Sequence, residues 1–151
     1  EKMDYFSKRK INIVLKDPVI PKQSKIMVVG NSGVGKTQIL TTLTKTNTNF
    51  GNSTLPDSSN SNQIKFTTGV DIFHKQFLIR EGYSLNMNFW DFSGKKEFTA
   101  IRSEFYSESH GIIYVFDLND PSSFANLDAW IKECKKYYGD KLIPLLIGNK
   151  K

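Results

Sequence analysis

Short apolar runs alternate with amphipathic or polar segments along most of the chain. Runs of four to eight apolar residues bounded by turn residues indicate buried strands, and apolar positions at three- to four-residue spacing indicate helices. The expected strands are 25–29, 66–80, 84–91, 111–118 and 141–147, and the expected helices are 35–44, 97–107 and 120–139. Strands 66–80 and 84–91 meet at Glu81-Gly82 and predict an antiparallel hairpin. The order predicts an α/β fold with a doubly wound, mostly parallel sheet and one antiparallel strand.

The clearest amphipathic stretch follows the strand 111–118. Asp120 is placed to cap a helix and Pro121 to occupy its first turn, while Gly139 ends the pattern. Its apolar positions are Phe124, Leu127, Ile131, Cys134 and Tyr138. This spacing predicts that Cys134 is a small core residue.

The chain divides into an N-terminal extension, 1–24, and one domain, 25–151. A total of 151 residues suffices for one core and is short for two. Within the domain, 44–63 is rich in Asn, Ser and Thr, so we expect a disordered insertion there.

Charge and composition narrow the classes of partner and compartment. The net charge is +6 and the pI about 9.3, which raises the question of nucleic-acid binding. The basic residues do not form a stripe interleaved with aromatics, so we expect no nucleic-acid partner. The single cysteine is compatible with a reducing compartment, and no apolar run approaches the roughly 20 residues of a membrane span. We therefore expect a cytoplasmic protein.

Residues 30–37, GNSGVGKT, fit the pattern G-x-x-x-x-G-K-[ST] in full. The segment follows an expected strand and opens an expected helix, which is the context that the motif requires. Glycines let main-chain N–H groups wrap a phosphate chain, and the helix N-terminus adds partial positive charge. We expect Lys36 to reach the β- and γ-phosphates and Thr37 to ligate Mg2+. The expected nucleotide-binding residues here are Asn31, Ser32, Gly33, Val34, Gly35, Lys36, Thr37 and Gln38.

Two further motifs follow neighbouring strands. Asp91 begins the motif D-x-x-G directly after Met87-Asn88-Phe89-Trp90, where a carboxylate can organise Mg2+ through water. Gly94 ends that motif and lets a backbone N–H approach the γ-phosphate. Asn149 and Lys150 follow the strand 141–147, where an amide can bind a base edge and the lysine stem can lie along the base plane.

Taken together, these motifs resemble those of the Ras-superfamily small GTPases, and of the Rab branch in particular. The resemblance covers nearly everything from Lys25 onward and implies the P-loop GTPase domain. The matching segments are GNSGVGKT, TTGVDIF, NFWDFSGKKEF, HGIIYVFDLNDPSSFANLDAW and LIGNK. Segments 102–106 and 127–130 also resemble the subgroup of Rab-like proteins sometimes linked to a DnaJ domain.

The resemblance implies a switch that binds GTP or GDP with Mg2+ and serves in signalling or vesicle transport. Thr67 is then the switch I threonine, whose hydroxyl ligates Mg2+ and whose N–H binds the γ-phosphate. Residues 64–77 and 91–107 become the switches that meet effectors, GTPase-activating proteins and exchange factors. The resemblance allows attachment to the cytosolic face of membranes, which this chain does not show. The implied catalytic residues are Lys36, Thr67, Gly94 and Lys95, and the metal site is Thr37, Thr67 and, through water, Asp91.

Lys95 departs from the family pattern, because the family has its catalytic glutamine there. Glutamine can accept a hydrogen bond from the attacking water and also donate one, whereas lysine only donates. We therefore expect slow intrinsic hydrolysis, with fast turnover supplied by a partner. The alternative is that Lys95 points to solvent and the domain is a non-catalytic GTP-binding scaffold.

Other departures leave nucleotide choice open. The motif N-K-x-D stops after Lys151, so the aspartate that would select guanine is not in the sequence. The resemblance also implies that the last strand and helix of the domain lie beyond Lys151. A P-loop ATPase or small-molecule kinase is a third hypothesis, although the expected hairpin leaves little room for a lid segment. His74 and His110 have no partner at metal-ligand spacing, and we expect both to be structural or exposed.

Overall fold

The computed structural model describes residues 23–45, 67–80, 83–138 and 141–151. Nearly all of the predicted extension and insertion lies outside these ranges, as do the hairpin turn 81–82 and the predicted helix end at Gly139. The sheet, its helices and the polar segments beside them belong to the described residues.

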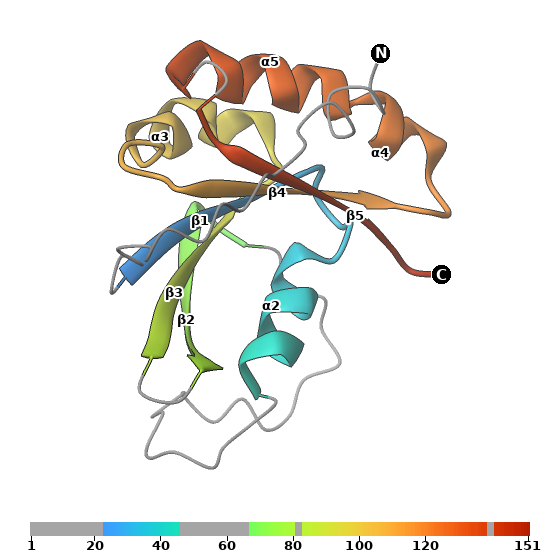
Figure 1. Cartoon of the computed structure of the whole chain (residues 1–151). Coiled ribbons are helices and arrows are strands. Elements are labelled where there is room, and N and C mark those ends of the chain that lie inside the picture. Colours follow the sequence, from blue (N-terminus) through green and yellow to red (C-terminus); the bar gives the residue numbers. More distant parts are fainter. Residues whose placement is uncertain (1–22, 46–66, 81–82, 139–140) are drawn as a thin grey trace.

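Five strands form one sheet in the order β2-β3-β1-β4-β5 (Figure 1). The parallel neighbours of β1 are β3 and β4, and β5 is parallel to β4, whereas β2 pairs with β3 in the antiparallel sense. The strands are β1 Gln23–Val29, β2 Val70–Arg80, β3 Tyr83–Phe92, β4 Gly111–Asp117 and β5 Ile143–Asn149. The predicted mostly parallel α/β sheet with one antiparallel strand is thus confirmed. The first expected hairpin strand began four residues too early, since 67–69 precede β2.

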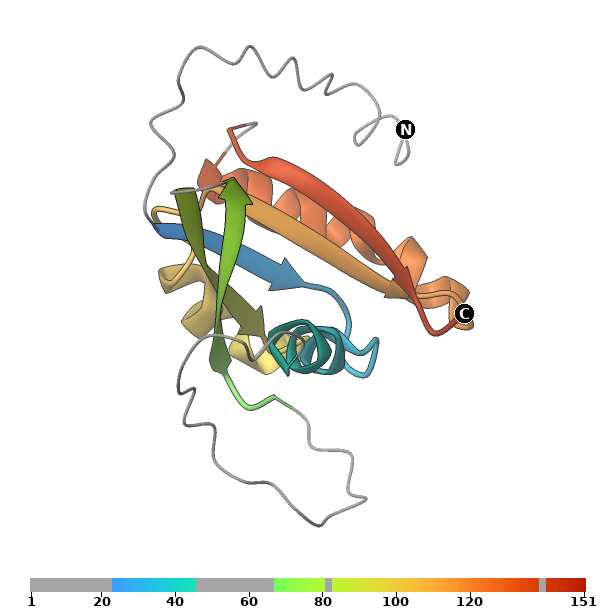
Figure 2. The ribbon, with the colours of Figure 1, turned by 60° about the horizontal axis from the view of Figure 1, so that its bottom comes forward.

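The helices lie on both faces of this sheet, with α2 on one face and α3 and α5 on the other (Figures 1 and 2). Their bounds are α2 Lys36–Lys45, α3 Thr99–Glu104, α4 Pro121–Ala125 and α5 Leu127–Tyr138, and the short 3-10 helix η1 is Lys96–Phe98. None of the helices among the described residues has both the length and the apolar character that crossing a membrane requires.

The single helix predicted from Asp120 onward is two helices in the structure, α4 and α5. Asp120 caps α4 through its side chain and Pro121 stands in the first turn, as expected, but α4 ends at Ala125 and Asn126 is its C-cap. The Asn126 N–H donates to the Ser122 carbonyl at 2.9 Å, and its own carbonyl accepts from Ala129 and Trp130 in α5. An apolar pattern cannot show such a break, because both helices bury the same face of their stretch.

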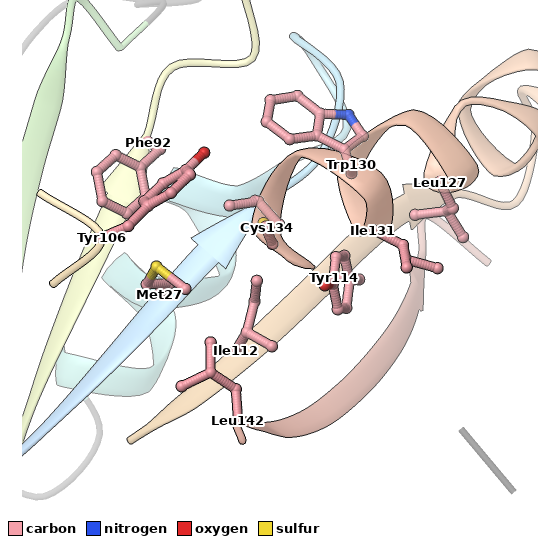
Figure 3. Packing of buried hydrophobic residues seen from close by; sticks show 11 residues of the cluster. Met27, Phe92, Tyr106, Ile112, Tyr114, Leu127, Trp130, Ile131, Cys134 and Leu142 are labelled. Carbon is pink, nitrogen blue, oxygen red and sulfur yellow. The ribbon is translucent and has the colours of Figure 1, made fainter. Parts of the chain in front are cut away.

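The core has two layers because side chains of a strand alternate between the faces of the sheet. In β1, Met27 and Val29 pack under α5, whereas Val28 packs on the α2 side with Leu40. Figure 3 shows the α5 layer, in which Cys134 is buried as predicted. The remaining labelled members of that layer are Phe92, Tyr106, Ile112, Tyr114, Leu127, Trp130, Ile131 and Leu142.

The topology brings several polar segments to one edge of the sheet. The parallel strands β1, β3, β4 and β5 all end at this edge, and the antiparallel β2 begins there. The loops that follow those strands therefore converge near the C-terminal end of β1, which lies at the centre of the sheet between β3 and β4. In open α/β sheets this is where ligands bind.

Candidate functional site

The loop between β1 and α2 carries the predicted phosphate motif. Gly35 has φ +95°, a left-handed conformation that favours glycine, and a Cβ there would lie 2.3 Å from the Asn149 amide nitrogen. The loop then enters α2 at Lys36, so the first N–H groups of that helix face the sheet edge. Backbone donors and a helix N-terminus are thereby placed together.

Lys36 brings a positive charge into this loop. The side chain is 6% exposed, and Nζ donates to the carbonyl oxygens of Gly30 and Asn31, both at 2.9 Å. An ammonium has three donors, so one remains for a ligand. Burial lowers the pKa of Lys36 to about 8, although the Asp91 carboxylate opposes the shift. An anion bound at the loop would offset the cost of burying this charge.

Three oxygen-bearing side chains from three segments meet beside Lys36. The Oγ1 atoms of Thr37 and Thr67 are 2.8 Å apart, and Thr67 Oγ1 lies 3.2 Å from Asp91 Oδ2. Thr37 also donates to that carboxylate oxygen. The structure therefore brings together the three residues predicted as the metal site.

The chemistry of these oxygens suits Mg2+. Adjacent ligands of an octahedral Mg2+ with bonds of 2.0–2.1 Å lie about 2.9 Å apart, close to the separation of the two hydroxyls. Asp91 is fully buried, and its Oδ1 has no hydrogen-bond partner. Burial raises the pKa of Asp91, although hydrogen bonds from the threonines and the Lys36 charge oppose the shift. A nearby cation, directly or through water, would satisfy the orphaned oxygen and favour the charged form.

Gly94 lies against the phosphate loop itself. A Cβ at this position would be 2.2 Å from the Ser32 nitrogen and 2.6 Å from the Gly30 oxygen. The preceding Ser93 N–H donates to the Gly69 carbonyl at 2.9 Å, which links the segment after β3 to the segment before β2. Both predicted switches therefore approach the loop, and only glycine fits at the contact.

Lys95 lies at the surface next to this contact. Its side chain is 48% exposed, and Nζ is 3.7 Å from Glu97 Oε1. The neighbouring Lys96 is exposed as well. The residue at the position of the family's glutamine thus carries a solvated ammonium.

The last residue of β5, Asn149, contacts the phosphate loop, and Lys150 follows it. Asn149 Nδ2 donates to the Val34 carbonyl at 2.9 Å. Lys150 adopts φ +62°, and its Nζ lies 2.8 Å from Asp117 Oδ2. The Asn119 amide also donates to the Lys150 carbonyl.

Asp117 was missed by sequence reasoning. It is the last residue of β4, so it ends at the same sheet edge as Asn149, its register partner on β5. Hydrogen bonds from Lys150 and from the Asn119 N–H lower the pKa of this carboxyl. An acidic residue at the end of a predicted parallel strand is the signal that could have identified it.

The other predicted nucleotide-binding residues lie in the phosphate loop and the first turn of α2, and the two histidines lie elsewhere. Ser32 and Gly33 are exposed at the loop, Val34 is buried on the α2 side, and Gln38 is exposed in the first turn of α2. His74 Nδ1 is 2.6 Å from Asn88 Oδ1, and His110 Nδ1 accepts from the Lys25 N–H. Within the described ranges, no three His, Cys, Asp or Glu side chains gather in a way that could hold a metal.

Comparisons with known proteins agree with this arrangement. A family model described as "Ras of Complex, Roc, domain of DAPkinase" matches residues 25–151. Ras-related protein RabC of Dictyostelium discoideum is 36% identical over 127 residues, which are 83% of this chain and 59% of that protein. GTP-binding protein YPTM2 of Zea mays is 35% identical, and GTP-binding protein YPT1 of Saccharomyces cerevisiae 33%, each over 83% of this chain and 56% and 55% of its own length.

The chain spans less than two thirds of the length of these curated relatives. The match nevertheless runs from Lys25, within β1, to Lys151, after β5. The narrower likeness to the DnaJ-linked subgroup stays a prediction. The chain belongs to the Ras-superfamily small GTPases and is Rab-like.

Proposed function

We propose that this domain is a guanine-nucleotide switch that binds GTP and GDP with Mg2+. The observation that carries the proposal is the meeting of Thr37, Thr67 and the buried Asp91 beside the Lys36 ammonium. A positive charge, backbone donors and an oxygen set for a hard cation are together what a Mg2+-bound triphosphate requires. The names of the relatives, GTP-binding and Ras-related proteins, point to the guanine base.

In this proposal each element has one task. Nucleotide phosphates lie along the main chain of 31–35 and the start of α2, where Lys36 donates to the β- and γ-phosphates. Bound Mg2+ would neutralise phosphate charge, held by the hydroxyls of Thr37 and Thr67 and by Asp91 through water. Asn149 and Lys150 bind the base, with Asp117 and Asn119 fixing the lysine.

We further propose that partners read the state of the two switches. Ile72 in β2 is 45% exposed, and Ile101 and Phe105, in and just after α3, are 47% and 38% exposed. Trp90 and Phe105 stack with ring centroids 5.7 Å apart, which joins β3 to the second switch. Apolar side chains on segments that touch the nucleotide site suit an effector surface.

Nucleotide competition tests the proposal. We expect GTP and GDP to displace a fluorescent GDP from the purified protein in the presence of Mg2+. We expect ATP to fail at about a hundredfold excess, a difference of about 2.7 kcal/mol in binding free energy. Chelation of Mg2+ should weaken triphosphate binding. Equal displacement by ATP and GTP would favour the P-loop ATPase or kinase hypothesis.

In hydrolysis, water attacks the γ-phosphorus, the bond from that phosphorus to the β–γ bridging oxygen breaks, and GDP and inorganic phosphate are released. The solvated Lys95 ammonium cannot accept a hydrogen bond from that water, so we propose a slow intrinsic rate. The same observation favours the second candidate, a GTP-binding scaffold without turnover. Turnover separates the two, since a scaffold would convert none of its bound GTP to GDP in a single-turnover assay.

We predict that Lys95→Gln raises the single-turnover rate of GTP hydrolysis about tenfold. A positioned general base contributes about 10²–10⁴-fold, and we expect less from glutamine because it orients the attacking water without taking its proton. Lys96→Gln, which removes the adjacent exposed lysine, is the matched control and should leave the rate unaltered. Brisk hydrolysis by the unmodified protein, insensitive to Lys95→Gln, would contradict this prediction.

A further inference from the structure

Arg102 of α3 is a buried cation close to the nucleotide site. The proposed function gives this residue no role. Its side chain is 3% exposed, although arginine is rarely buried without a partner. A guanidinium has five N–H donors, and five acceptor atoms surround this one within 3.3 Å. They are Glu133 Oε1 and Oε2, the carbonyl oxygens of Ser93 and Lys95, and Thr99 Oγ1.

Two of these acceptors belong to the backbone on either side of Gly94. Arg102 Nη1 donates to the Lys95 carbonyl at 2.8 Å and to the Ser93 carbonyl at 3.3 Å. Gly94 is the residue whose Cα lies against the Ser32 nitrogen of the phosphate loop. Arg102 therefore holds the peptide units that place Gly94 at this contact.

The other end of the guanidinium is attached to α5. Glu133 accepts from Nε and Nη2, both at 2.8 Å, which is the bidentate geometry of a strong pair. The Tyr106 hydroxyl donates to Glu133 Oε1 at 2.6 Å. Burial would raise the pKa of Glu133, but the hydrogen bonds from Arg102 and Tyr106 lower it. Glu133 thus stays charged and fixes the direction of the arginine.

Helix α5 also contacts the phosphate loop. The Arg102 guanidinium lies over the Trp130 ring, 4.5 Å from its centroid, and Trp130 Nε1 donates to Asn31 Oδ1 at 3.0 Å. Both sides of the Gly94 contact are therefore bonded to one turn of α5.

Gly94 borders a cavity on the side that faces α5. This cavity of about 330 Å³ is lined by Asn31, Gly94, Lys96, Thr99, Arg102, Asn126, Ala129, Trp130 and Glu133. Hydrogen bonds from Arg102, together with the bond from the Ser93 N–H to the Gly69 carbonyl, thus hold the backbone around Gly94.

We propose that Arg102, oriented by Glu133, is a positioning residue that holds Gly94 against the phosphate loop and so determines how strongly the second switch responds to the γ-phosphate. The inference rests on the proposed GTP-binding function. It makes α5 part of the switch, because Arg102 links the carbonyls on either side of Gly94 to Glu133 of that helix.

The test compares GTP and GDP binding in Arg102→Lys and Glu133→Gln. Lysine keeps the charge but cannot reach both carbonyls and Glu133, and glutamine removes the charge that orients the arginine. We expect the ratio of GTP to GDP affinity to fall about tenfold in both, since a lost hydrogen bond to a charged group has about this effect. Amide hydrogen exchange at Gly94 in the complex with a non-hydrolysable GTP analogue should lose its protection.

The matched control is Lys132→Gln, which changes the exposed neighbour of Glu133 on α5 and should change neither readout. Circular dichroism verifies that each variant is folded. If Arg102→Lys does not fold, Glu133→Gln alone provides the test. Equal losses of GTP and GDP affinity, or an unchanged ratio in folded variants, would overturn the inference. Failure of the unmodified protein to bind either nucleotide would instead reject the proposed function.

Discussion

We expect Lys36→Ala to lower the affinity for both GTP and GDP by about 10²–10³-fold. Truncating one member of a buried, hydrogen-bonded charge pair costs about 2–5 kcal/mol, and tenfold in affinity is about 1.4 kcal/mol. Both nucleotides carry the β-phosphate that Lys36 is proposed to meet, so both should be affected. Two of the three donors of Lys36 already bind the loop carbonyls, so the substitution also loosens the loop.

Equilibrium binding of fluorescent GDP and GTP analogues measures this effect. Lys45→Ala is the matched control, because Lys45 is the exposed last residue of the same helix α2. The control should bind both nucleotides as the unmodified protein does. If Lys36→Ala kept its affinity while remaining folded, the anion would not bind at this loop and the proposed function would fail.

Much of this site could be predicted because its residues follow strands directly. Lys36, Asp91 and Asn149 each lie within a few residues of an apolar run, and parallel strands end at a common edge. Once the strand pattern was recognised, the meeting of these segments followed from topology alone. Asp117, which ends β4, carries the same signal, although it is not among the predicted site residues.

The contacts of Arg102 with Glu133 could not be predicted in this way. These residues are 31 positions apart on α3 and α5, and no strand end marks either of them. Their pairing depends on how two helices pack on the same face of the sheet, which periodicity does not give. The break at Asn126 was missed for a related reason, since it changes hydrogen bonds without changing which face is apolar.

The segments of the site contact the phosphate loop in different ways. Asn149 is bonded directly to the phosphate loop, at Val34, whereas Gly94 reaches the loop by close approach of its backbone. Hydrogen bonds between side chain and backbone tolerate small shifts, but an approach this close depends on the absence of a Cβ. The response to the γ-phosphate should therefore be most sensitive to substitution at Gly94.

Gly94→Ala is accordingly expected to reduce the ratio of GTP to GDP affinity by about 10–100-fold. The added Cβ would lie 2.2 Å from the Ser32 nitrogen and 2.4 Å from the Asn31 carbonyl carbon, and all of the nearest atoms are backbone. Overpacking of this kind costs about 1–3 kcal/mol, so the segment must move away from the loop. GDP lacks the γ-phosphate that Gly94 is proposed to contact, and GDP affinity serves as the internal control.

Amide hydrogen exchange over 91–98 provides the second measurement for Gly94→Ala. In the unmodified protein we expect a GTP analogue to protect these amides more than GDP does, because only the triphosphate can hold the loop closed. In the alanine variant that difference should vanish while protection of β1 and β4 is kept. An unchanged difference would mean that the loop closes without the Gly94 contact, and the second switch would then have to sense the γ-phosphate through another group.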